Sequence, residues 1–477
     1  MAPGDSARLY HRLSSYWYVP GIDWLPPIKH PLVRQDFVPN HLPTFPAPTK
    51  SYPSSLPTVE LPATWPRVPG SATAVMGGLP APVARPLDLA GLARVLHLSA
   101  GVVRVALRRD GRRFLFRAAG SAGGLFPLEL YVAALGVPGL PDGVHWYDPV
   151  GHALRQVGPP PVGEATTLIL TGIPWRTGWR YAERGLRHIY WDAGTMLSHT
   201  LLLATSGGLA PRLFTRFDDG GIARLVGADG VQEFPLALVA LGPGAPAIDA
   251  GGGATTGVID REPVDFPLVT LAQRAGDNDR LGRPWPSAPV LDGEPPPSED
   301  LDIVILRRGS ARTLDPGAAV DRRTFDFSLA ASLRGTSVPH FIAVHAVDGI
   351  QPGLYRWPDL EHPLRRGSLR DELWVACYEQ DLGRDASFVV IGAVDLEGLD
   401  DRGYREAQLD AGLVEGRLDL VAYALGIGAS GMTFLDSEIE ALLGQPLAGL
   451  LFTCVGVPLH RTRRAGSPRA PTDVSEP

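Results

Sequence analysis

The sequence predicts an α+β protein in which one domain is present twice. Residues 183–194 read ERGLRHIYWDAG and residues 401–412 read DRGYREAQLDAG, a repeat with an offset of 218 residues. A weaker match joins residues 137–154 to residues 347–364. This period is far longer than the ~20–50 residues of a solenoid unit, and it indicates a duplicated domain. Tandem copies of this kind predict a pseudo-dimer inside one chain, the covalent form of a two-fold homodimer.

Each copy is expected to alternate helices with short strands. An apolar segment with helical spacing follows each DAG, at 195–208 and 413–426, and a strand-like run ending at glycine comes later, at 234–242 and 450–456. The gaps between these elements are too irregular for the regular βαβ units of a Rossmann fold, and no GxGxxG follows a strand. Both observations favour α+β over α/β.

Stretches rich in proline and glycine set the expected boundaries. We expect an extended N-terminal arm (1–75), a first domain (76–250), a linker (251–300), a second domain (301–464) and a disordered tail (465–477). The arm is expected to wrap the core or to meet a partner enzyme or the substrate.

Composition excludes several classes of protein. The 477 residues are 44% hydrophobic and 20% charged, as in soluble two-domain proteins, and no apolar run reaches the ~18 residues of a membrane span. A net charge of −7 with dispersed arginines argues against nucleic acid as a partner. The opening residues lack the order of a signal peptide, and Cys377 and Cys454 are the only cysteines, which predicts a cytoplasmic protein without disulfides. No His, Cys, Asp and Glu cluster has metal-ligand spacing.

Three ordered motifs carry a family resemblance. They are YHRLSSYWYVPG at 10–21, RAAGSAGGLFPLELYVAALGVPGLPDGVHWYDPVGHAL at 117–154 and TGIPWRTGWRYAERGLRHIYWDAG at 171–194. Together they resemble the SagB-type azoline dehydrogenases, an FMN-dependent branch of the nitroreductase family. The resemblance covers most of residues 8–245, and a weaker nitroreductase resemblance covers 303–464. It implies two tandem nitroreductase-like domains that oxidise azoline rings of a ribosomally made precursor peptide to thiazoles or oxazoles, after a cyclodehydratase has acted.

The resemblance also implies an FMN held between the two units. The second unit would supply RRGSARTL (307–314) and the basic end of VPLHRTRR (457–464) to the ribityl phosphate, because guanidinium groups form charge-assisted bonds with phosphate oxygens. It would also supply LGIGASGMTFLD (425–436) near the pyrimidine side, whereas the first unit would place GSAGGLFP (120–127) over the ring. The implied cofactor-binding residues are Arg308, Ser310, Arg312, Ser121, Ala122, Gly123, Gly431, Met432, Thr433, Phe434, Arg461 and Arg463.

The reciprocal set of FMN-binding pieces is incomplete. Residues 65–80, upstream of the first unit, contain no Arg-x-Ser-x-Arg. The counterpart of the second unit's glycine segment is SGGLAPR (206–212), and the counterpart of GSAGGLFP is the shorter TSVPHFIA (336–343). We therefore expect one FMN per chain.

The expected catalytic pair is Arg180 and Tyr181 in GWRYAERG (178–185). SagB-type enzymes carry a Lys-Tyr pair in this region, but the only lysines here are Lys29 and Lys50. Arginine cannot act as the base because its pKa stays above ~12. The resemblance therefore gives the role of base to Tyr181, with the charge of Arg180 favouring the phenolate.

Simpler interpretations of the same residues remain open. The sequence RRGSAR could be a solvated basic turn, Arg461 and Arg463 a solvated tail, and WRY an aromatic helix start. The repeated Arg and Asp residues are expected to be structural, as helix-start charges or a buried ion pair, and His188 and His199 to lie at the surface or in the core. Two other functions also remain: a general NAD(P)H-dependent nitro or quinone reductase, and a flavin-free degenerate scaffold of a peptide-modifying complex. A homodimer of the whole chain is possible in each case.

Overall fold

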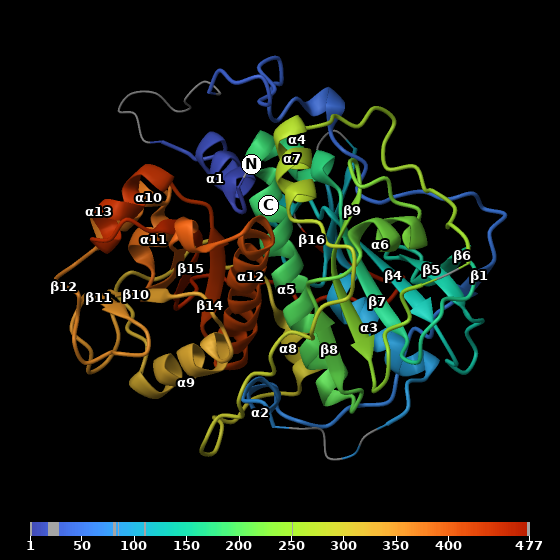
Figure 1. Cartoon of the computed structure of the whole chain (residues 1–477). Coiled ribbons are helices and arrows are strands. Elements are labelled where there is room, and N and C mark those ends of the chain that lie inside the picture. The colour runs from blue at the N-terminus through green and yellow to red at the C-terminus, as the bar shows by residue number, and fades with distance from the viewer. Residues whose placement is uncertain are drawn as a thin grey trace.

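Two long helices, α5 (Gly185–Ser206) and α12 (Asp401–Ala424), lie side by side at the centre of the molecule, with one β-sheet beyond each (Figure 1). The computed structural model describes residues 2–17, 28–79, 83, 85–108, 111–249 and 251–474. The last four residues of the motif at 10–21 lie outside the described residues. None of the helices in this described part is long and apolar enough to span a bilayer.

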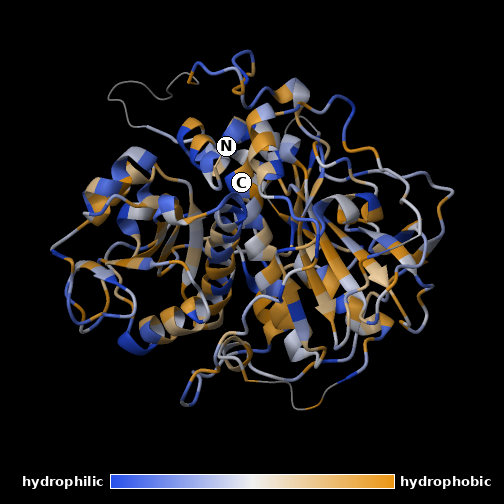
Figure 2. Cartoon of the chain, viewed as in Figure 1, coloured by the Kyte–Doolittle hydropathy of each residue, from blue (hydrophilic) through white to orange (hydrophobic). Residues whose placement is uncertain are grey.

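The first sheet has seven strands in the order β1-β6-β5-β4-β7-β9-β8, and every neighbouring pair is antiparallel. Its strands are β1 (Thr58–Glu60), β4 (Leu128–Ala134), β5 (Gly143–Asp148), β6 (Ala153–Gly158), β7 (Thr167–Gly172), β8 (Pro211–Phe214) and β9 (Phe234–Leu241). Strands β4, β7 and β9 are buried along their whole length, and Figure 2 shows this sheet as largely hydrophobic.

The second sheet repeats this topology. Its order β12-β11-β10-β13-β15-β14 corresponds strand by strand to β6-β5-β4-β7-β9-β8, again with antiparallel pairs throughout. Its strands are β10 (His340–Val344), β11 (Gly353–Arg356), β12 (Arg365–Arg366), β13 (Phe388–Val394), β14 (Gly428–Met432) and β15 (Ala448–Gly456). The duplicated α+β domain predicted from the repeat is therefore confirmed, with the two copies forming a pseudo-dimer.

A third, small sheet belongs to the first unit. Strands β2 (Val102–Leu107) and β3 (Arg113–Arg117) form a hairpin, and β16 (Thr472–Val474) pairs parallel to β2. We expected residues 465–477 to be disordered, and this prediction is wrong for 472–474, which form β16. The backbone contact of Gly466 with Val103 and the ion pair of Arg469 with Glu60 hold the preceding residues in place.

The N-terminal arm and the linker also contain helices. The arm includes α1 (Asp5–Leu13) and α2 (Ala72–Met76), and the linker includes α7 (Pro267–Ala275), which packs on α1. The remaining α-helices are α3 (Leu89–Ala100), α4 (Pro174–Tyr181), α6 (Asp219–Val226), α8 (Leu301–Arg307), α9 (Arg322–Leu333), α10 (Arg370–Ala376), α11 (Asp381–Asp385) and α13 (Ile439–Leu443). The N-terminal arm and the linker are thus partly helical, and their helices pack against the two units.

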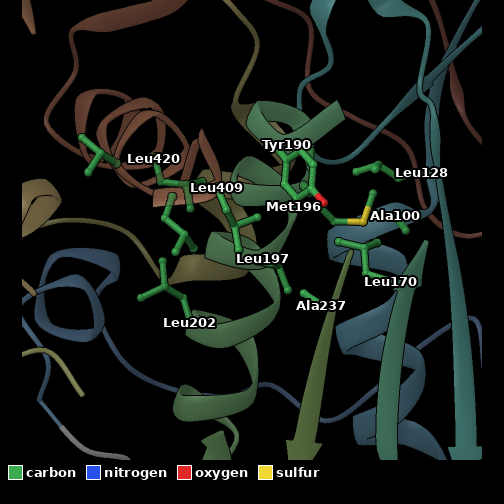
Figure 3. Close-up of a cluster of buried hydrophobic side chains, with 14 of the residues drawn as sticks. Ala100, Leu128, Leu170, Tyr190, Met196, Leu197, Leu202, Ala237, Leu409 and Leu420 are labelled. Atoms are coloured by element: carbon green, nitrogen blue, oxygen red, sulfur yellow. The ribbon is translucent and has the colours of Figure 1, made fainter. Parts of the chain in front are cut away.

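The repeated glycines allow α5 and α12 to cross at backbone contact. A Cβ atom on Gly194 would lie 2.4 Å from the backbone of Gly412, and a Cβ atom on Gly412 would overlap the backbone of Trp191. Real Cβ atoms do not approach other atoms this closely, so only glycine permits the crossing. Figure 3 shows α5 side chains filling the space toward α12 and toward the first sheet, with Leu409 and Leu420 from α12 and Leu170 and Ala237 from the strands.

Candidate functional site

The repeated arginines of α5 form buried ion pairs with the other unit. Arg184 and Arg187 both donate to the carboxylate of Asp436, which follows β14, and the Arg187 contact is 2.7 Å long. All three side chains are at least nine-tenths buried. Burial alone would raise the pKa of Asp436, but the two guanidinium groups hold that pKa well below its usual range.

The repeated arginines of α12 make the reciprocal contact. Arg402 and Arg405 donate to Asp219 of the first unit, at 2.7 Å and 2.9 Å. Each unit therefore supplies the counter-charge for the other unit's arginines. The repeated arginines are therefore structural and form buried ion pairs, but with Asp219 and Asp436 outside the repeat and not with the repeated aspartates. His188 and His199 are also buried, as core histidines.

The repeated aspartates hold two equivalent loops. Asp192 accepts hydrogen bonds from the Ser121 hydroxyl at 2.6 Å and from the backbone N–H of Ala122 at 2.9 Å. Asp410 in the second unit accepts in the same way from the Thr336 hydroxyl at 2.8 Å and from the Ser337 N–H at 3.0 Å. Burial raises the pKa of Asp192 to about 7.

The loop of the first unit meets Arg308 of the second unit. Arg308 donates to the backbone carbonyl of Ala118 at 2.9 Å, and a Cβ atom on Gly120 would lie 3.3 Å from its guanidinium. Its other terminal nitrogen donates to Asp419 at 2.5 Å, and both side chains of this ion pair are buried. Arg308 therefore lies where GSAGGLFP and RRGSARTL come together, with its charge already balanced by Asp419.

The two other predicted phosphate-binding pieces also lie together. A Cβ atom on Gly309 would overlap the Thr462 side chain, so RRGSARTL packs directly against VPLHRTRR. The exposed residues of these two segments include Ser310, Arg312, Arg461 and Arg463. Among the residues described, neither Arg312 nor Arg461 forms an ion pair, so their charges remain available to a ligand.

The predicted glycine segment has one accessible side and one core side. Gly431 is exposed and Thr433 is half-buried, with a hydroxyl that has no hydrogen-bond partner in the described structure. Met432 and Phe434 are buried, and Phe434 stacks on Phe452 with ring centroids 4.8 Å apart. The segment can therefore meet a ligand through Gly431 and Thr433, while Met432 and Phe434 belong to the core.

Arg180 and Tyr181, at the end of α4, lie beside the same loop of the first unit. A Cβ atom on Gly123 would lie 2.8 Å from the Arg180 guanidinium and 2.9 Å from the Tyr181 hydroxyl. Tyr181 stacks on His188 with ring centroids 3.8 Å apart. Burial raises the pKa of Tyr181 to about 12, which outweighs the lowering by Arg180. Arg180 thus favours the phenolate, as expected from the sequence, but burial has the larger effect on this pKa.

Two acids on α12, the half-buried Glu415 and the buried Asp419, were not among the residues predicted for the site. Glu415 on α12 accepts a hydrogen bond from the Thr195 hydroxyl, and a Cβ atom on Gly431 would lie 3.2 Å from its carboxylate. Burial, followed by the neighbouring charge of Asp419, raises the pKa of Glu415 to about 8. The repeat could have identified both acids. At the offset of 218 residues, Glu415 and Asp419 correspond to two leucines of the first unit, Leu197 and Leu201.

The residues at this junction fit a flavin mononucleotide. Three buried polar atoms lack a hydrogen-bond partner among the described residues: Arg308 Nε, Asp419 Oδ1 and the Thr433 hydroxyl. Unpaired buried polar atoms are rare and cost free energy, so an additional polar ligand is readily accommodated here. The loop Ser121–Gly124 is half-buried and comes from the first unit, whereas the exposed arginines come from the second. Both units thus contribute polar groups to one place.

Comparison with known proteins agrees with this fold. No family model matches the chain. The "Putative nitroreductase MJ1384" of Methanocaldococcus jannaschii is 29% identical over 172 residues, which are 33% of this chain and 81% of that protein. The crystal structure of a "putative nitroreductase" from Anabaena variabilis is similar with a TM-score of 0.70 and 23% identity, and the match covers 95% of this chain and 99% of that chain. The chain consists of two nitroreductase-like domains in tandem.

Proposed function

We propose that the chain is an FMN-dependent oxidoreductase that oxidises azoline rings in a ribosomally made, modified peptide to azoles. One observation carries the proposal: a single segment of the first unit, residues 118–124, contacts Arg308 of the second unit at Ala118 and Gly120 and contacts Arg180 and Tyr181 at Gly123. The azoline ring would be formed by a cyclodehydratase that acts before this protein. The motifs at 117–154 and 171–194 support the azoline as substrate.

The residues suited to hold the cofactor come from both units. Arg312, Arg461 and Arg463 are exposed and would bind the phosphate, together with Ser310, while Arg308 would position the loop at Ala118. The half-buried loop Ser121–Gly124, Gly431 and Thr433 would line the ring. Bound FMN supplies the acceptor for the two electrons that leave the azoline.

One cofactor per chain is expected because the reciprocal junction lacks the matching groups. There, Asp410 holds the loop at Thr336 and Ser337, and residues 334–339 lead straight from α9 into β10. Leu197 and Leu201 occupy the α5 positions that correspond to Glu415 and Asp419. An apolar helix face offers no proton acceptor and no partner for a buried arginine.

Azole formation removes two hydrogens from adjacent ring carbons, and one leaves as a proton that a base must accept. At neutral pH the Tyr181 hydroxyl stays protonated, so it is suited to donate a hydrogen bond and orient the substrate. Glu415 has a pKa of about 8 and lies beside Gly431, which makes it a second candidate for the base. The negative charge of Asp192 raises the pKa of both Tyr181 and Glu415. These three side chains therefore interact electrostatically with one another.

The test combines flavin content with turnover. Purified protein should release one FMN per chain, and a cyclodehydrated peptide should lose two hydrogens per azoline by mass spectrometry. Colourless protein that cannot be reconstituted with FMN would contradict the proposal, as would two FMN per chain. Flavin-replete protein that is inert on azolines would remove the substrate assignment while keeping the flavin.

The pH profile separates the two candidate bases. With Glu415 as the base, turnover should rise with pH and level off above about 8, whereas with Tyr181 it should keep rising toward about 12. Substitution of the base, by Glu415→Gln or Tyr181→Phe, should lower turnover by about 10²–10⁴ without loss of FMN. Arg180→Lys, which restores the Lys-Tyr pair, should preserve or raise activity. Equal activity of both flavin-replete variants and the wild type would assign the base elsewhere.

A second function is favoured by the protonated state of Tyr181. A nitro or quinone reductase needs no base that removes a carbon-bound proton, and the two similar proteins described above are each named "putative nitroreductase". Rapid oxidation of NAD(P)H with small nitroarenes or quinones, by protein that is inert on azolines, would establish it. The flavin-free scaffold is favoured only by the internal pairing of Arg308 with Asp419, and bound FMN would exclude it.

A further inference from the structure

Arg104, on strand β2 of the first unit, is a buried arginine whose hydrogen bonds all go to the second unit. Its side chain is 5% exposed. Its Nε donates to the Arg463 carbonyl at 2.8 Å, and its Nη2 donates to the carbonyls of Leu306 and Arg308 at 3.1 Å and 2.9 Å. One guanidinium group therefore joins the end of α8 to the segment 457–464, and these are the two places where the sequence predicts phosphate-binding residues.

The contact with α8 fixes how the chain leaves that helix. The last carbonyls of a helix have no partner within it and carry partial negative charge, so a guanidinium group is well suited to bind them. The helix ends at Arg307, and Arg308 already has an extended backbone with a ψ of 145°. Ser310 and Arg312, which follow, are exposed. Arg104 thus helps to set the direction in which these two residues are presented.

The segment 457–464 is held at its far end by the same strand. The backbone N–H of Ala465 donates to the Leu306 carbonyl at 2.6 Å, so this carbonyl accepts from both Ala465 and Arg104. The next residue, Gly466, donates its N–H to the Val103 carbonyl at 2.9 Å. The exposed residues Arg461 and Arg463 therefore come from a segment that is fixed between α8 and β2 where it ends.

The positive charge of Arg104 has no negative counterpart nearby. In the part of the chain that the structure describes, its hydrogen-bond partners are three backbone carbonyls and no carboxylate. Arg308, in contrast, forms an ion pair with Asp419. Burial, followed by the charge of Arg308, lowers the pKa of Arg104 to about 10, so the group is still protonated at neutral pH. Buried charges are normally paired, and an anion bound close by would supply the missing charge.

Arg104 has no equivalent in the second unit. The β2–β3 hairpin that carries it is inserted between α3 and the loop Ser121–Gly124. The second unit passes from α9 into β10 through residues 334–339, which contain no strand. The motif Arg-x-Ser-x-Arg likewise occurs at 308–312 and not upstream of the first unit. The buried arginine and the segments that it joins therefore belong to the same single site.

We propose that Arg104 is a positioning residue for the phosphate of FMN. It holds the segments 307–314 and 457–464 in the arrangement that binds the phosphate, and its buried positive charge adds to their attraction for the anion. The inference rests on the proposed function, because it takes the anion to be the phosphate of the cofactor. The first unit then contributes to both ends of the FMN, through the loop Ser121–Gly124 at the ring and through Arg104 at the phosphate.

The test compares two flavins that differ only in the phosphate. Protein freed of FMN is titrated with FMN and with riboflavin, which has the same ring and ribityl chain, and flavin fluorescence gives both dissociation constants. Arg104→Gln should weaken FMN binding by about 10- to 100-fold and leave riboflavin binding unchanged. Arg104→Lys should recover part of the loss, since an ammonium group keeps the charge but lacks the planar fork that reaches several carbonyls.

Two exposed arginines serve as matched controls for this test. They are Arg113 on the same hairpin and Arg323 on α9, and their replacement by glutamine should change neither dissociation constant. The melting temperature of each FMN-free variant shows whether the fold is kept. If Arg104→Gln does not fold, Arg104→Lys carries the test, because it should still weaken FMN binding more than riboflavin binding.

Three results would overturn the role of Arg104. They are unchanged FMN affinity of Arg104→Gln, an equal loss of affinity for both flavins, which indicates a structural role only, and full FMN affinity of Arg104→Lys, which indicates that charge alone matters. Wild-type protein that binds neither flavin would overturn the proposed function together with this inference. Protein that binds FMN through Arg104 but oxidises no azoline would remove the reaction and keep the positioning residue.

Discussion

The two central helices carry the same structural residues but different acids. Both α5 and α12 place two arginines on an aspartate of the opposite unit, hold a loop through a second aspartate, and cross at a glycine. Only α12 adds Glu415 and Asp419, where α5 has leucines. Residues shared by both halves maintain the interface between them, and residues present in one half lie at the candidate site.

The largest effect is expected from removing the counter-charges of the shared arginines. Asp436→Asn leaves Arg184 and Arg187 buried without a full negative charge, and Asp219→Asn does the same to Arg402 and Arg405. Each substitution should lower the free energy of unfolding by about 3–5 kcal/mol, measured by denaturant titration. A large loss for one variant and none for the other would show that the two halves of the interface are not equivalent.

The glycine crossing should be the next most sensitive feature. Gly194→Ala and Gly412→Ala each place a methyl group against the facing backbone, and the helices must separate to accept it. Overpacking of this kind costs about 1–3 kcal/mol. Gly398→Ala, where a Cβ atom would meet nothing within 4 Å, is the control. Unchanged stability of both crossing variants would mean that the helices tolerate a wider spacing.

The acids confined to α12 should make stability depend on pH. The pKa of Glu415 is raised from 4.5 to about 8, so the folded state binds its proton more tightly than the unfolded state. Stability gained from this group is fully present below pH 4.5 and is lost as the pH rises through about 8. Glu415→Leu introduces the residue that α5 has at the equivalent position, Leu197. It should increase the free energy of unfolding by about 1–2 kcal/mol more at pH 9 than at pH 5, measured by denaturant titration at the two pH values. The same increment at both pH values would mean that Glu415 is ionised throughout.

The smallest effect is expected from single exposed arginines of the second unit. Arg312→Gln or Arg461→Gln should weaken FMN binding by about 10-fold, the value of one charge-assisted contact, with no change in melting temperature of the FMN-free protein. Arg323→Gln is the matched control. Retention of FMN by the double variant would place the phosphate elsewhere.

Much of the fold follows from the sequence because a duplicated domain repeats its own signals. The helices at 195–208 and 413–426 and the strands before Gly242 and Gly456 lie where the apolar patterns predicted them. A repeat cannot tell which copy contacts which, so the crossed partners Asp219 and Asp436 emerged only from the structure. The tail was misjudged because β16 depends on pairing with β2, a contact distant in sequence.

The candidate site was predicted less completely. Some of the pieces that the motifs named do contact one another, since Arg308 lies against Gly120 and Gly309 lies against Thr462. Protonation states depend on burial, which a linear sequence does not display. The pKa of Tyr181 therefore rises where the charge of Arg180 alone predicted a fall, and Glu415 lies in a segment that the sequence predicted only as an apolar helix.

The chain between residues 251 and 300 changes how the crossed ion pairs behave on dilution. In a dimer of separate chains, such contacts form only above the dissociation constant, so stability falls as the protein is diluted. A tether gives the second unit an effective concentration near the first that does not depend on the amount of protein. In a homodimer, one substitution changes both subunits. In a tandem chain, each half can differ, as α5 and α12 do at the equivalent positions Leu197 and Glu415.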